Sequence, residues 1–597
     1  MSGLAGRFFD LVMRRSLAAW RRDLGEPRRA QERSLLAILA RNAATEFGRR
    51  HGFAALARLA GDGLWREFRA AVPLRPYEEF RPWLDRMREG EGNLLVPGRP
   101  EMFSLTSGSS AEPKFCPVTR PFILEHHRQH LLWMHGCCRD HPGILGGKFL
   151  AVTSPAVMGR TPGGIPFGSM SGKQLESQAI PVRRRLAAPP ETAALPDPAA
   201  RWFNLLLFAL ARPDLRLVVA VNPSTLTLLA ERLASGAEEL LEGLGRGHPA
   251  ARDASAPPLL RKLAARFRPD PARARRLREI LRAEGRLVPA AAWPQLELLL
   301  AWRSGSAALY LPRVEEAWGP LPGRCLGLRA SEGTFSLPLR DGDPAGVLAV
   351  GGHVLEFLPA ADGPPAPEAP ALRADQLERD GLYRLAVTTS GGFYRYDLAD
   401  LVRVAGFNRR TPEIVFERRA GAVLSATGEK VTESQVLAAL GDAAGDLPLN
   451  GFTLTWELTE GRAGYVLALE CPGGEARLRR GDGEFRERLD RLIARFDAGL
   501  RDRNLEYRAK RADGRLASPR LLLLAEGAYE GLRAAAAARG RPEGQFKPPV
   551  LAAPPGPGRA PVPGCPVFDR LPLARPGNPD RLGSGPKKGS ETNSPKL

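Results

Sequence analysis

The sequence is poor in cysteine and lysine and has no long hydrophobic run, and these absences exclude several classes of protein. Six cysteines spread over 597 residues form neither a disulfide framework nor paired C-x-x-C zinc motifs, a pattern typical of a reducing compartment. No run reaches the roughly 18 to 20 apolar residues that span a bilayer. We therefore expect a cytoplasmic protein without a transmembrane segment.

The composition that remains is that of a globular protein. Hydrophobic residues make up 43% of the chain and charged residues 25%, which excludes collagen-like, coiled-coil and wholly disordered proteins. A chain of 597 residues predicts two to four domains. The net charge of +20 makes an acidic partner plausible, such as nucleic acid, anionic lipid or a polyphosphate nucleotide.

The pattern along the chain predicts an α/β fold. Apolar residues recur at helical spacing up to about residue 90, with breaks at Pro27, Pro73 and Pro76. Residues 148–153 and 215–221 are strand-like and are each joined to helical segments, which indicates an α/β sheet. Short strand-like runs, among them residues 307–311 and 382–387, crowd together between residues 307 and 404, so this half is richer in β structure.

Two changes in amino-acid composition predict the domain boundaries. A polar, glycine-containing stretch at residues 417–421 suggests a hinge, which gives an N-terminal domain over residues 1–418 and a second domain over residues 419–550. In the second domain we expect strands at residues 453–458, 465–469 and 521–524 and helices at 485–496 and 529–539. The last 47 residues hold 11 prolines and 7 glycines and carry 7 basic against 3 acidic side chains. They bury too little apolar surface to offset the entropy of ordering, so we expect residues 551–597 to form a disordered basic tail.

Residues 105–114 are the first candidate site. Four hydroxyl residues, a glycine and a lysine lie within nine positions, and such a loop can wrap an anion with backbone N–H groups and hydroxyls while the lysine adds a point charge for phosphate. The order of residues is not that of the G-x-x-x-x-G-K-[ST] phosphate loop. Taken alone, a flexible Ser/Gly turn explains the segment equally well.

Three further clusters could serve a nucleotide. Glu332 follows a short apolar strand, where a carboxylate could hold a magnesium ion that bridges phosphates. Asp400 lies at the start of another strand, where it could accept hydrogen bonds from ribose hydroxyls. Lys430 and Lys547 each follow a glycine-containing turn in the second domain. Surface charge is a sufficient explanation for any one of these clusters taken singly.

The order of these motifs resembles a known family. The chain contains T-S-G-S-S-A-E-P-K at 106–114, A-S-E-G at 330–333, F-Y-R-Y-D-L-A-D-L-V-R-V-A-G-F at 393–407, V-L-S-A-T-G-E-K-V-T-E at 423–433 and G-Q-F-K-P-P at 544–549. This series is similar to the Gretchen Hagen family, the auxin-responsive acyl acid amido synthetases of plants and their bacterial relatives, within the acyl-adenylate-forming superfamily. The resemblance runs from about residue 40 to 550, nearly everything except the tail.

The resemblance implies a fold and an activity. The fold is a large N-terminal α/β domain with mixed sheets, which binds ATP and the acid, and a smaller mobile C-terminal α+β domain. The activity is an acid–amino acid ligase that adenylates a carboxylic acid with ATP and Mg²⁺, releases pyrophosphate, and transfers the acyl group to an amine. An amino acid is the expected acceptor and a monomer the expected state, with no specific nucleic acid partner.

The resemblance also implies roles for single residues. Glu332 is implied to hold magnesium, and Lys430 and Lys547 to face the acyl phosphate as catalytic lysines. The residues implied to contact the nucleotide are Thr106, Ser107, Gly108, Ser109, Ser110, Lys114, Ser331, Asp400 and Arg418.

Three positions depart from the family pattern. Ala111 and Ala399 stand where glycine is usual, and Leu328 stands where a tyrosine usually precedes the Ser-Glu pair. An alanine at the first two positions is free of strain only where φ is negative. Leu328 lacks the aromatic face that would stack on adenine.

Several alternatives stay open at this point. The chain could be a ligase that forms thioesters with coenzyme A, or a degenerate, non-catalytic protein that binds a nucleotide or another anion. A protein that uses its positive charge on nucleic acid or an anionic membrane is a third class, but no helix-turn-helix or zinc-finger signature supports it. A histidine-rich segment at residues 126–141 has metal-like spacing, yet no completed zinc motif, so we expect a helix with exposed imidazoles.

Overall fold

The structure is a computed structural model of the chain. It describes residues 4–106, 114–251, 253, 255–304, 307–308, 311–360, 365–420, 423–445, 447–459, 461–532, 550–554 and 567–570. The chain divides into two compact units. The first unit comprises Met1–Val436, Leu458–Ala463 and Leu500–Ala517, and the second comprises Leu437–Glu457, Gly464–Gly499 and Ser518–Leu597.

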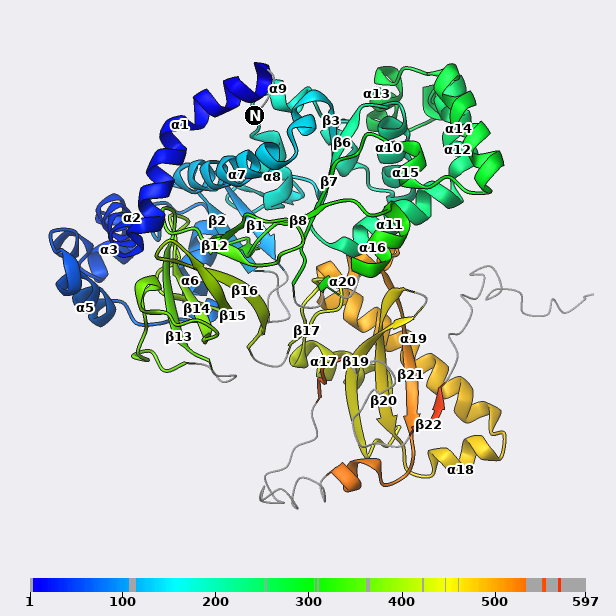
Figure 1. The fold of residues 1–597 in the computed structure, drawn as a ribbon. Coiled ribbons are helices and arrows are strands. Elements are labelled where there is room, and N and C mark those ends of the chain that lie inside the picture. The colour runs from blue at the N-terminus through cyan, green and yellow to red at the C-terminus, as the bar shows by residue number, and fades with distance from the viewer. Residues whose placement is uncertain are drawn as a thin grey trace, which may run out of the picture. The chain divides into compact units, whose positions relative to one another are not determined.

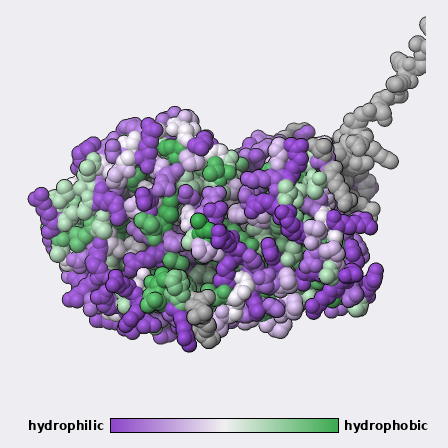
Figure 2. Space-filling model, turned by 90° about the horizontal axis from the view of Figure 1, so that it is seen from above, coloured by the Kyte–Doolittle hydropathy of each residue, from purple (hydrophilic) through white to green (hydrophobic). Residues whose placement is uncertain are grey.

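The first unit begins with helices, as the sequence predicts (Figure 1). Helix α1 (Leu4–Gly25) is followed by α2 (Pro27–Asn42), which starts with Pro27 in its first turn, where the missing N–H costs nothing. The next longer helices are α5 (Gly61–Ala71) and α6 (Tyr77–Arg88), and Pro73 and Pro76 lie between them. Exposed apolar residues occur on α1, and the face shown in Figure 2 is mostly hydrophilic with hydrophobic groups scattered among the polar ones.

A parallel sheet with the order β3-β6-β7-β8 lies next in the chain. Its strands are β3 (Lys148–Val152), β6 (Leu215–Ala220), β7 (Leu298–Ala301) and β8 (Gly323–Cys325). The first two confirm predicted strands. The strand expected at residues 307–311 is wrong in its described part, because its last residue begins helix α16 (Leu311–Trp318); residues 309 and 310 lie outside the described residues. The fully buried β7 takes the place between β6 and β8.

Helices pack on both sides of the parallel sheet. One core cluster joins it to α10 (Pro198–Leu210), α11 (Pro223–Ser235), α12 (Ala237–Arg246), α14 (Pro271–Glu284) and α16. A second core cluster joins its other side to α7 (Arg120–Asp140) and to the β-rich part of the unit. Burial on both sides explains why β7 is a continuous apolar run.

Antiparallel strands build the rest of the first unit. The largest sheet has the order β11-β12-β16-β15-β14-β13. Its strands are β11 (Ser336–Pro338), β12 (Gly346–Leu348), β13 (Val354–Pro359), β14 (Leu382–Thr388) and the long strands β15 (Tyr396–Asn408) and β16 (Thr411–Arg419). A smaller mixed sheet has the order β2-β1-β5-β4, with β4 (Gly159–Arg160) and β5 (Pro166–Gly168), and its strands β1 (Met102–Thr106) and β2 (Lys114–Val118) form an antiparallel hairpin. Short pairs β9-β10 (Arg329–Ala330, Gly333–Thr334) and β17-β18 (Val423–Leu424, Val431–Thr432) complete the unit.

The second unit is built on one sheet with the order β19-β20-β21-β22. Its strands β19 (Gly451–Thr459), β20 (Arg462–Glu470) and β21 (Leu516–Leu524) match predicted strands, and α19 (Gly483–Arg503) matches a predicted helix. The last strand, β22 (Val567–Arg570), pairs with β21 and lies within the segment predicted as a tail. Among the described ranges, no helix combines the length and the apolar character that crossing a bilayer requires.

Candidate active site

The candidate site lies where the parallel strands end. Chain segments leave the carboxyl ends of β3, β6 and β8 at Thr153, Val221 and Leu326, and the last of these continues to Ser331 and Glu332. In α/β sheets, ligands bind in the crevice outside these strand ends. The order of the strands therefore brings residues from three distant parts of the sequence to one edge.

The hairpin of β1 and β2 supplies Lys114. Thr106 is the last residue of β1 and pairs directly with Lys114, the first residue of β2, so these two residues close the predicted phosphate loop. Ser107, Gly108, Ser109, Ser110 and Ala111 lie outside the described residues. The Lys114 side chain is buried, its Nζ lies 3.4 Å from the hydroxyl of Tyr396, and it sits 4.8 Å from the ring centroid of Tyr77. Aromatic faces favour a cation there and hold the ammonium in place.

Ser331 and Glu332 lie beside this hairpin. The hydroxyl of Ser104 donates to Ser331 Oγ at 3.1 Å, and Ser104 is the residue opposite Cys116 in the hairpin. Glu332 is buried and hydrogen-bonds with the thiol of Cys116. The two strands of the hairpin therefore touch both members of the Ser-Glu pair.

The pKa of the Cys116 thiol depends on charged groups from several motifs. Burial raises its pKa well above the ordinary value, and the negative charge of Glu332 raises it further. The positive charges of Lys114 and Lys430 lower the same pKa. Because charges act strongly only at short range within a protein, Glu332, Lys114 and Lys430 all lie near the Cys116 thiol although they come from three distant motifs. Cys116 itself is a free, buried cysteine, as expected.

A rigid turn carries Lys430. Its φ is +52°, a left-handed conformation that needs support from neighbours. The side-chain amide of Asn504 donates to the carbonyl oxygens of Glu429 and Lys430 at 2.9 and 3.3 Å. The buried Glu429 carboxylate accepts hydrogen bonds from Ala426 N, Thr427 N and Thr427 Oγ1 at 2.8, 2.9 and 2.6 Å.

Asp400 lies in an irregular part of β15. The pairing of β14 (Leu382–Thr388) with β15 shifts between Arg384 and Ala386, so that Leu398, Ala399 and Asp400 form a bulge. Bulges beside sites redirect side chains out of the regular alternation of a strand. Asp400 is buried and stands opposite Arg419 of β16, and Arg418 stands opposite Leu401. Lys547 lies outside the described residues.

Ala399 adopts the conformation that an alanine tolerates poorly. Its φ is +59°, so the negative φ that would leave an alanine unstrained is absent here. The backbone is held by Asp397, whose Oδ1 accepts from Ala399 N at 3.0 Å, and by Ala420 N, which donates to the Ala399 carbonyl at 2.7 Å. A glycine would adopt this left-handed conformation without the steric conflict of a Cβ.

The expectation that the imidazoles of the histidine-rich segment are exposed is wrong. The segment forms helix α7 as predicted, but His126 and His135 are buried rather than exposed. His126 hydrogen-bonds through its two ring nitrogens to Gln174 Oε1 and Thr334 Oγ1, both at 3.0 Å. Within the described part of the chain, no group of three histidine, cysteine or carboxylate side chains is placed to hold a metal.

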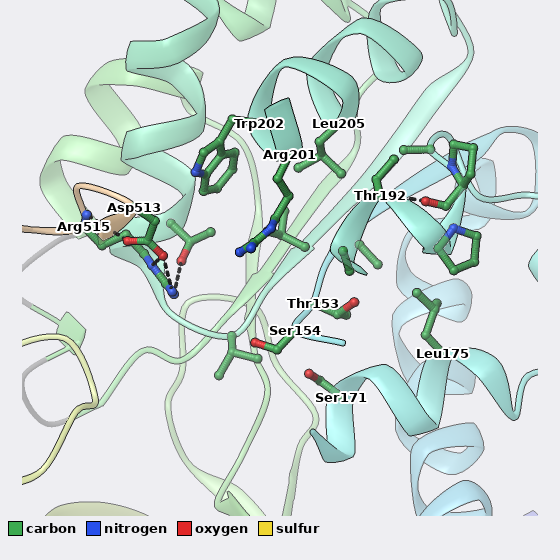
Figure 3. Close-up of a pocket in the computed structure, with 18 residues that line it drawn as sticks. Thr153, Ser154, Ser171, Leu175, Thr192, Arg201, Trp202, Leu205, Asp513 and Arg515 are labelled. Atoms are coloured by element: carbon green, nitrogen blue, oxygen red, sulfur yellow. Dashed lines mark hydrogen bonds and ion pairs between the residues drawn. The ribbon is translucent and has the colours of Figure 1, made fainter. Parts of the chain in front are cut away.

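A pocket opens at the same edge of the sheet, beyond β3 and β6 (Figure 3). It encloses about 810 Å³ of empty space, counting the part open to solvent. In Figure 3, Arg201 and Trp202 extend from α10 on one side, and Thr153, Ser154 and Ser171 lie across from them. None of the predicted site residues that the structure describes lines this pocket.

The pocket carries a net positive charge. Arg515 forms an ion pair with Asp513 and lies 3.3 Å from Thr225 Oγ1, while Arg201 donates to the Leu195 carbonyl at 2.9 and 3.2 Å. Two arginines against one aspartate leave one positive charge in a lining of hydroxyl and apolar groups. No sequence pattern indicates this pocket, because Arg201, Asp513 and Arg515 belong to ordinary helix and turn patterns.

Comparison with known proteins identifies the family. Residues 17–323 match the GH3 family N-terminal domain, residues 346–419 the GH3 family central domain and residues 434–555 the GH3 family C-terminal domain. The chain belongs to the GH3 family. This confirms the resemblance to the Gretchen Hagen family that the order of motifs indicates.

Relatives within the GH3 family match most of the chain. It is 28% identical over 554 residues to the probable indole-3-acetic acid-amido synthetase GH3.2 of Oryza sativa subsp. japonica, covering 87% of each sequence. It is 26% identical over 542 residues to the probable indole-3-acetic acid-amido synthetase GH3.1 of Arabidopsis thaliana, covering 87% of this chain and 88% of the relative. The solved structure of the GH3.15 acyl acid amido synthetase superposes with a TM-score of 0.60 at 22% identity, covering 90% of this chain and 93% of that one. The predicted fold class is thereby confirmed.

Proposed function

We propose that this GH3 protein is an ATP-dependent acyl acid amido synthetase that joins a carboxylic acid to an amino acid. One observation carries the proposal: the hairpin of Lys114 is hydrogen-bonded to Ser331, beside Glu332, and the charges of Lys114, Glu332 and Lys430 all act on the Cys116 thiol of that hairpin. Two cations and a carboxylate at the carboxyl edge of a parallel sheet suit a polyphosphate nucleotide and its counter-ion. The relatives named as amido synthetases support the choice of amide as product.

In the first half-reaction, the acid must gain a leaving group. A carboxylate oxygen attacks the α-phosphorus of ATP, the bond to the β-phosphate oxygen breaks, and pyrophosphate leaves as the acyl-adenylate forms. Lys114, fixed between Tyr77 and Tyr396, is proposed to neutralise phosphate charge together with the loop of Thr106, Ser107, Gly108, Ser109 and Ser110. Ser331 and Arg418 are proposed to contact the nucleotide and Asp400 to accept hydrogen bonds from its ribose.

Magnesium fits this donor set through one carboxylate. Glu332 is buried beside the cationic groups, and a hard oxygen ligand of this kind is what Mg²⁺ prefers. A single protein carboxylate is sufficient where phosphate oxygens and water complete the shell, as is usual for magnesium with nucleotides. When bound, the ion would neutralise phosphate charge.

In the second half-reaction, the nitrogen of the amine attacks the acyl carbonyl, AMP leaves, and a proton is lost from nitrogen. Lys430 and Lys547 are proposed as the lysines that stabilise charge around the acyl phosphate in these steps. The pocket of Figure 3 supports an amino acid as the amine, because Arg201 and Arg515 with the hydroxyls of Thr153, Ser154 and Ser171 fit an α-carboxylate. Five described cysteines are free and buried, which accords with a cytoplasmic enzyme, and we propose that it is monomeric.

A pyrophosphate-release screen tests the proposal. Panels of aromatic and aliphatic acids are combined with the twenty amino acids and with coenzyme A, and products are identified by mass spectrometry. We expect release with at least one acid and an amide product with an amino acid. Lys114→Ala should lower kcat/KM at least about a hundredfold. Lys262→Ala, on the exposed side of α13 (Pro258–Arg266), is the matched lysine control and should change nothing. A thioester as the sole product, or full activity of Lys114→Ala, contradicts the proposal.

A further inference from the structure

A largely buried polar cluster adjoins the candidate active site and has no role in the steps proposed above. It consists of residues from α7, β9 and the turn before β13 (Val354–Pro359), and we refer to it as the α7 cluster. Its members are His126, Gln129, His130, Arg329 and His353. Arg329 lies two positions before Ser331, and a Cβ on Gly333, the residue after Glu332, would lie 2.5 Å from His353 Nε2. The cluster therefore begins next to the Ser-Glu pair.

Many polar atoms in the α7 cluster are buried without a hydrogen-bond partner. They are both side-chain amide atoms of Gln129, Nδ1 of His130, both ring nitrogens of His353, and Nε and one terminal nitrogen of Arg329. Buried polar groups in proteins are almost always hydrogen-bonded, and an unpaired group costs free energy comparable to a lost bond. The concentration of unpaired, buried polar atoms in this cluster indicates a site for a polar ligand.

Glu125 is the carboxylate at the border of the α7 cluster. Its Oε2 lies 3.5 Å from His353 Nδ1, and the same oxygen accepts a hydrogen bond from Ser390 Oγ at 2.5 Å. Burial raises the pKa of Glu125, whereas the hydrogen bond from Ser390 and the charge of Arg41 lower it. One acceptor site of this oxygen is therefore used by Ser390, outside the cluster, while the oxygen also borders His353.

Arg329 is the charged residue of the α7 cluster. No carboxylate among the described residues lies within ion-pair distance of its guanidinium, which stacks 4.7 Å from the ring centroid of Trp133. Burial lowers its pKa to about 10, and the titratable groups that act on it in the opposite direction are the thiols of Cys137 and Cys325. Burial and the Arg329 charge lower the pKa of His126 to about 4 and that of His130 well below its ordinary value. The neighbouring imidazoles are thus neutral, and the Arg329 guanidinium has no counter-charge beside it.

Arg324 is a buried arginine of the same chain whose charge is neutralised by ion pairs. Its side chain is 1% exposed, and its guanidinium pairs with Asp341 at 2.6 Å and Asp140 at 2.8 Å. Both arginines approach α7 from neighbouring positions, but only Arg324 is neutralised within the fold. Two nitrogens of the partly buried Arg329 guanidinium are shielded from water without a partner, which costs stability unless a ligand supplies the counter-charge.

Arg329 also acts on other groups than the phosphate-side residues do. The charges that act on the Cys116 thiol are those of Glu332, Lys114 and Lys430, whereas the charge of Arg329 acts on histidines of α7. Because Arg329 is two positions before Ser331 and Gly333 lies against His353, an acid whose carboxylate reacts beside Ser331 and Glu332 could reach this cluster with the rest of its skeleton. We infer that the acid substrate carries a second anionic group, most simply a second carboxylate, which pairs with Arg329 and accepts hydrogen bonds from the α7 cluster. The inference rests on the proposed function and names the class of acid.

The test compares matched acids in the pyrophosphate-release assay. Each pair shares a carbon skeleton and differs by one carboxylate: benzoate with isophthalate and terephthalate, and straight-chain monoacids with the diacids of equal length. We expect the native protein to favour at least one diacid by about a hundredfold or more in kcat/KM. Arg329→Met, which keeps the length of the side chain and removes its charge, should abolish that preference, and Arg329→Lys should retain part of it.

A second readout does not depend on turnover. The favoured diacid should raise the thermal midpoint of the native protein and leave that of Arg329→Met unchanged, because only a ligand that binds the folded state stabilises it. Without ligand, Arg329→Met should be at least as stable as the native protein, whereas Arg324→Met, which strands two carboxylates, should be less stable.

The outcomes separate the two proposals. Turnover that favours monoacids, or an acid preference unchanged by Arg329→Met, overturns the inference and leaves the amido synthetase function standing. A higher KM for ATP with every acid in Arg329→Met would assign the guanidinium to the nucleotide and also overturn it. No pyrophosphate release with any acid refutes the proposed function, and the absence of a thermal shift with every diacid then refutes an anion site at Arg329 as well.

Discussion

The hydroxyl of Ser104 donates to the hydroxyl of Ser331 at 3.1 Å, and this bond joins β1 to the segment that carries Glu332. The two residues are 227 positions apart in the chain. Ser104 is fully buried, so the bond is shielded from water. It fixes the distance between the hairpin that carries Lys114 and the proposed magnesium ligand.

Removing this bond should loosen the site. We expect Ser104→Ala to lower the free energy of unfolding by about 1 kcal/mol, measured by urea denaturation, and to raise the KM for ATP. Ser34→Ala is the control, because Ser34 Oγ donates to the Ala30 carbonyl within α2 and joins no separate segments. Its effect should stay below about 0.5 kcal/mol. Equal effects of the two substitutions would contradict a positioning role for Ser104.

Ala399 offers a stabilising substitution. Its φ of +59° strains an alanine, so Ala399→Gly should raise the free energy of unfolding by up to about 1 kcal/mol. Ala405→Gly on the same strand, where φ is not positive, is the matched control and should lower it by about 0.5–1 kcal/mol. Urea denaturation of both variants measures the difference. A loss of stability in Ala399→Gly comparable to that of the control would show that strain at this position is negligible.

The buried Glu429 should be essential for the turn that carries Lys430. It accepts three hydrogen bonds and lies 3.6 Å from the buried ammonium of Lys510. Glu429→Gln removes the charge opposite Lys510, and breaking such a buried pair costs about 3–5 kcal/mol in unfolding free energy. The same lysine also meets Glu506 at 3.8 Å, whose side chain is 38% exposed.

Glu506→Gln is therefore the control for this prediction. An exposed pair contributes about 1 kcal/mol or less, so this variant should be close to the native protein in urea denaturation. If both glutamine variants lose the same stability, the turn is not held by Glu429 in particular.

Asp400 should recognise the ribose of ATP. We expect Asp400→Asn to raise the KM for ATP by about tenfold to a hundredfold, since an amide accepts hydrogen bonds more weakly than a carboxylate. Replacing ATP by 2′-deoxy-ATP should raise the KM of the native protein by a similar factor, and it should change the KM of Asp400→Asn little. Steady-state kinetics on the four combinations give the coupling between the residue and the hydroxyl. If the substitution and the missing hydroxyl affect the KM independently, so that their free-energy costs simply add, Asp400 does not contact the ribose.

The buried imidazole of His353 should make stability depend on pH. Burial lowers its pKa in the folded protein to about 3, from an ordinary value of 6.5, so protonation favours the unfolded state. Its contribution is complete above pH 6.5 and is lost as the pH falls toward 3, with a slope approaching about 1.4 kcal/mol per pH unit. His353→Gln should lack this part of the slope. Urea midpoints between pH 7 and pH 5 measure it, and identical slopes in the two proteins would contradict it.

The sequence predicted the fold class and the composition of the site because both follow from local patterns. Alternating and continuous apolar runs predicted β3, β6 and β14, and helical spacing predicted α7 and α19. The order of the motifs predicted membership of the GH3 family, which the domain matches confirm. The strand at residues 307–311 was wrong, because a short apolar run does not distinguish a strand from the start of a helix.

What chemistry is available was determined by the residue types along the chain: a hydroxyl-rich loop ending in a lysine, a Ser-Glu pair and lysines in glycine-containing turns. Where those groups meet was decided only by the tertiary structure, through the strand order β3-β6-β7-β8 and the hairpin that sets Ser104 opposite Cys116. The same holds for the pocket around Arg201, the left-handed Ala399 and the unpaired charge of Arg329. Side-chain identity is local information, whereas burial and electrostatic neighbours depend on residues hundreds of positions away, which no short pattern can specify.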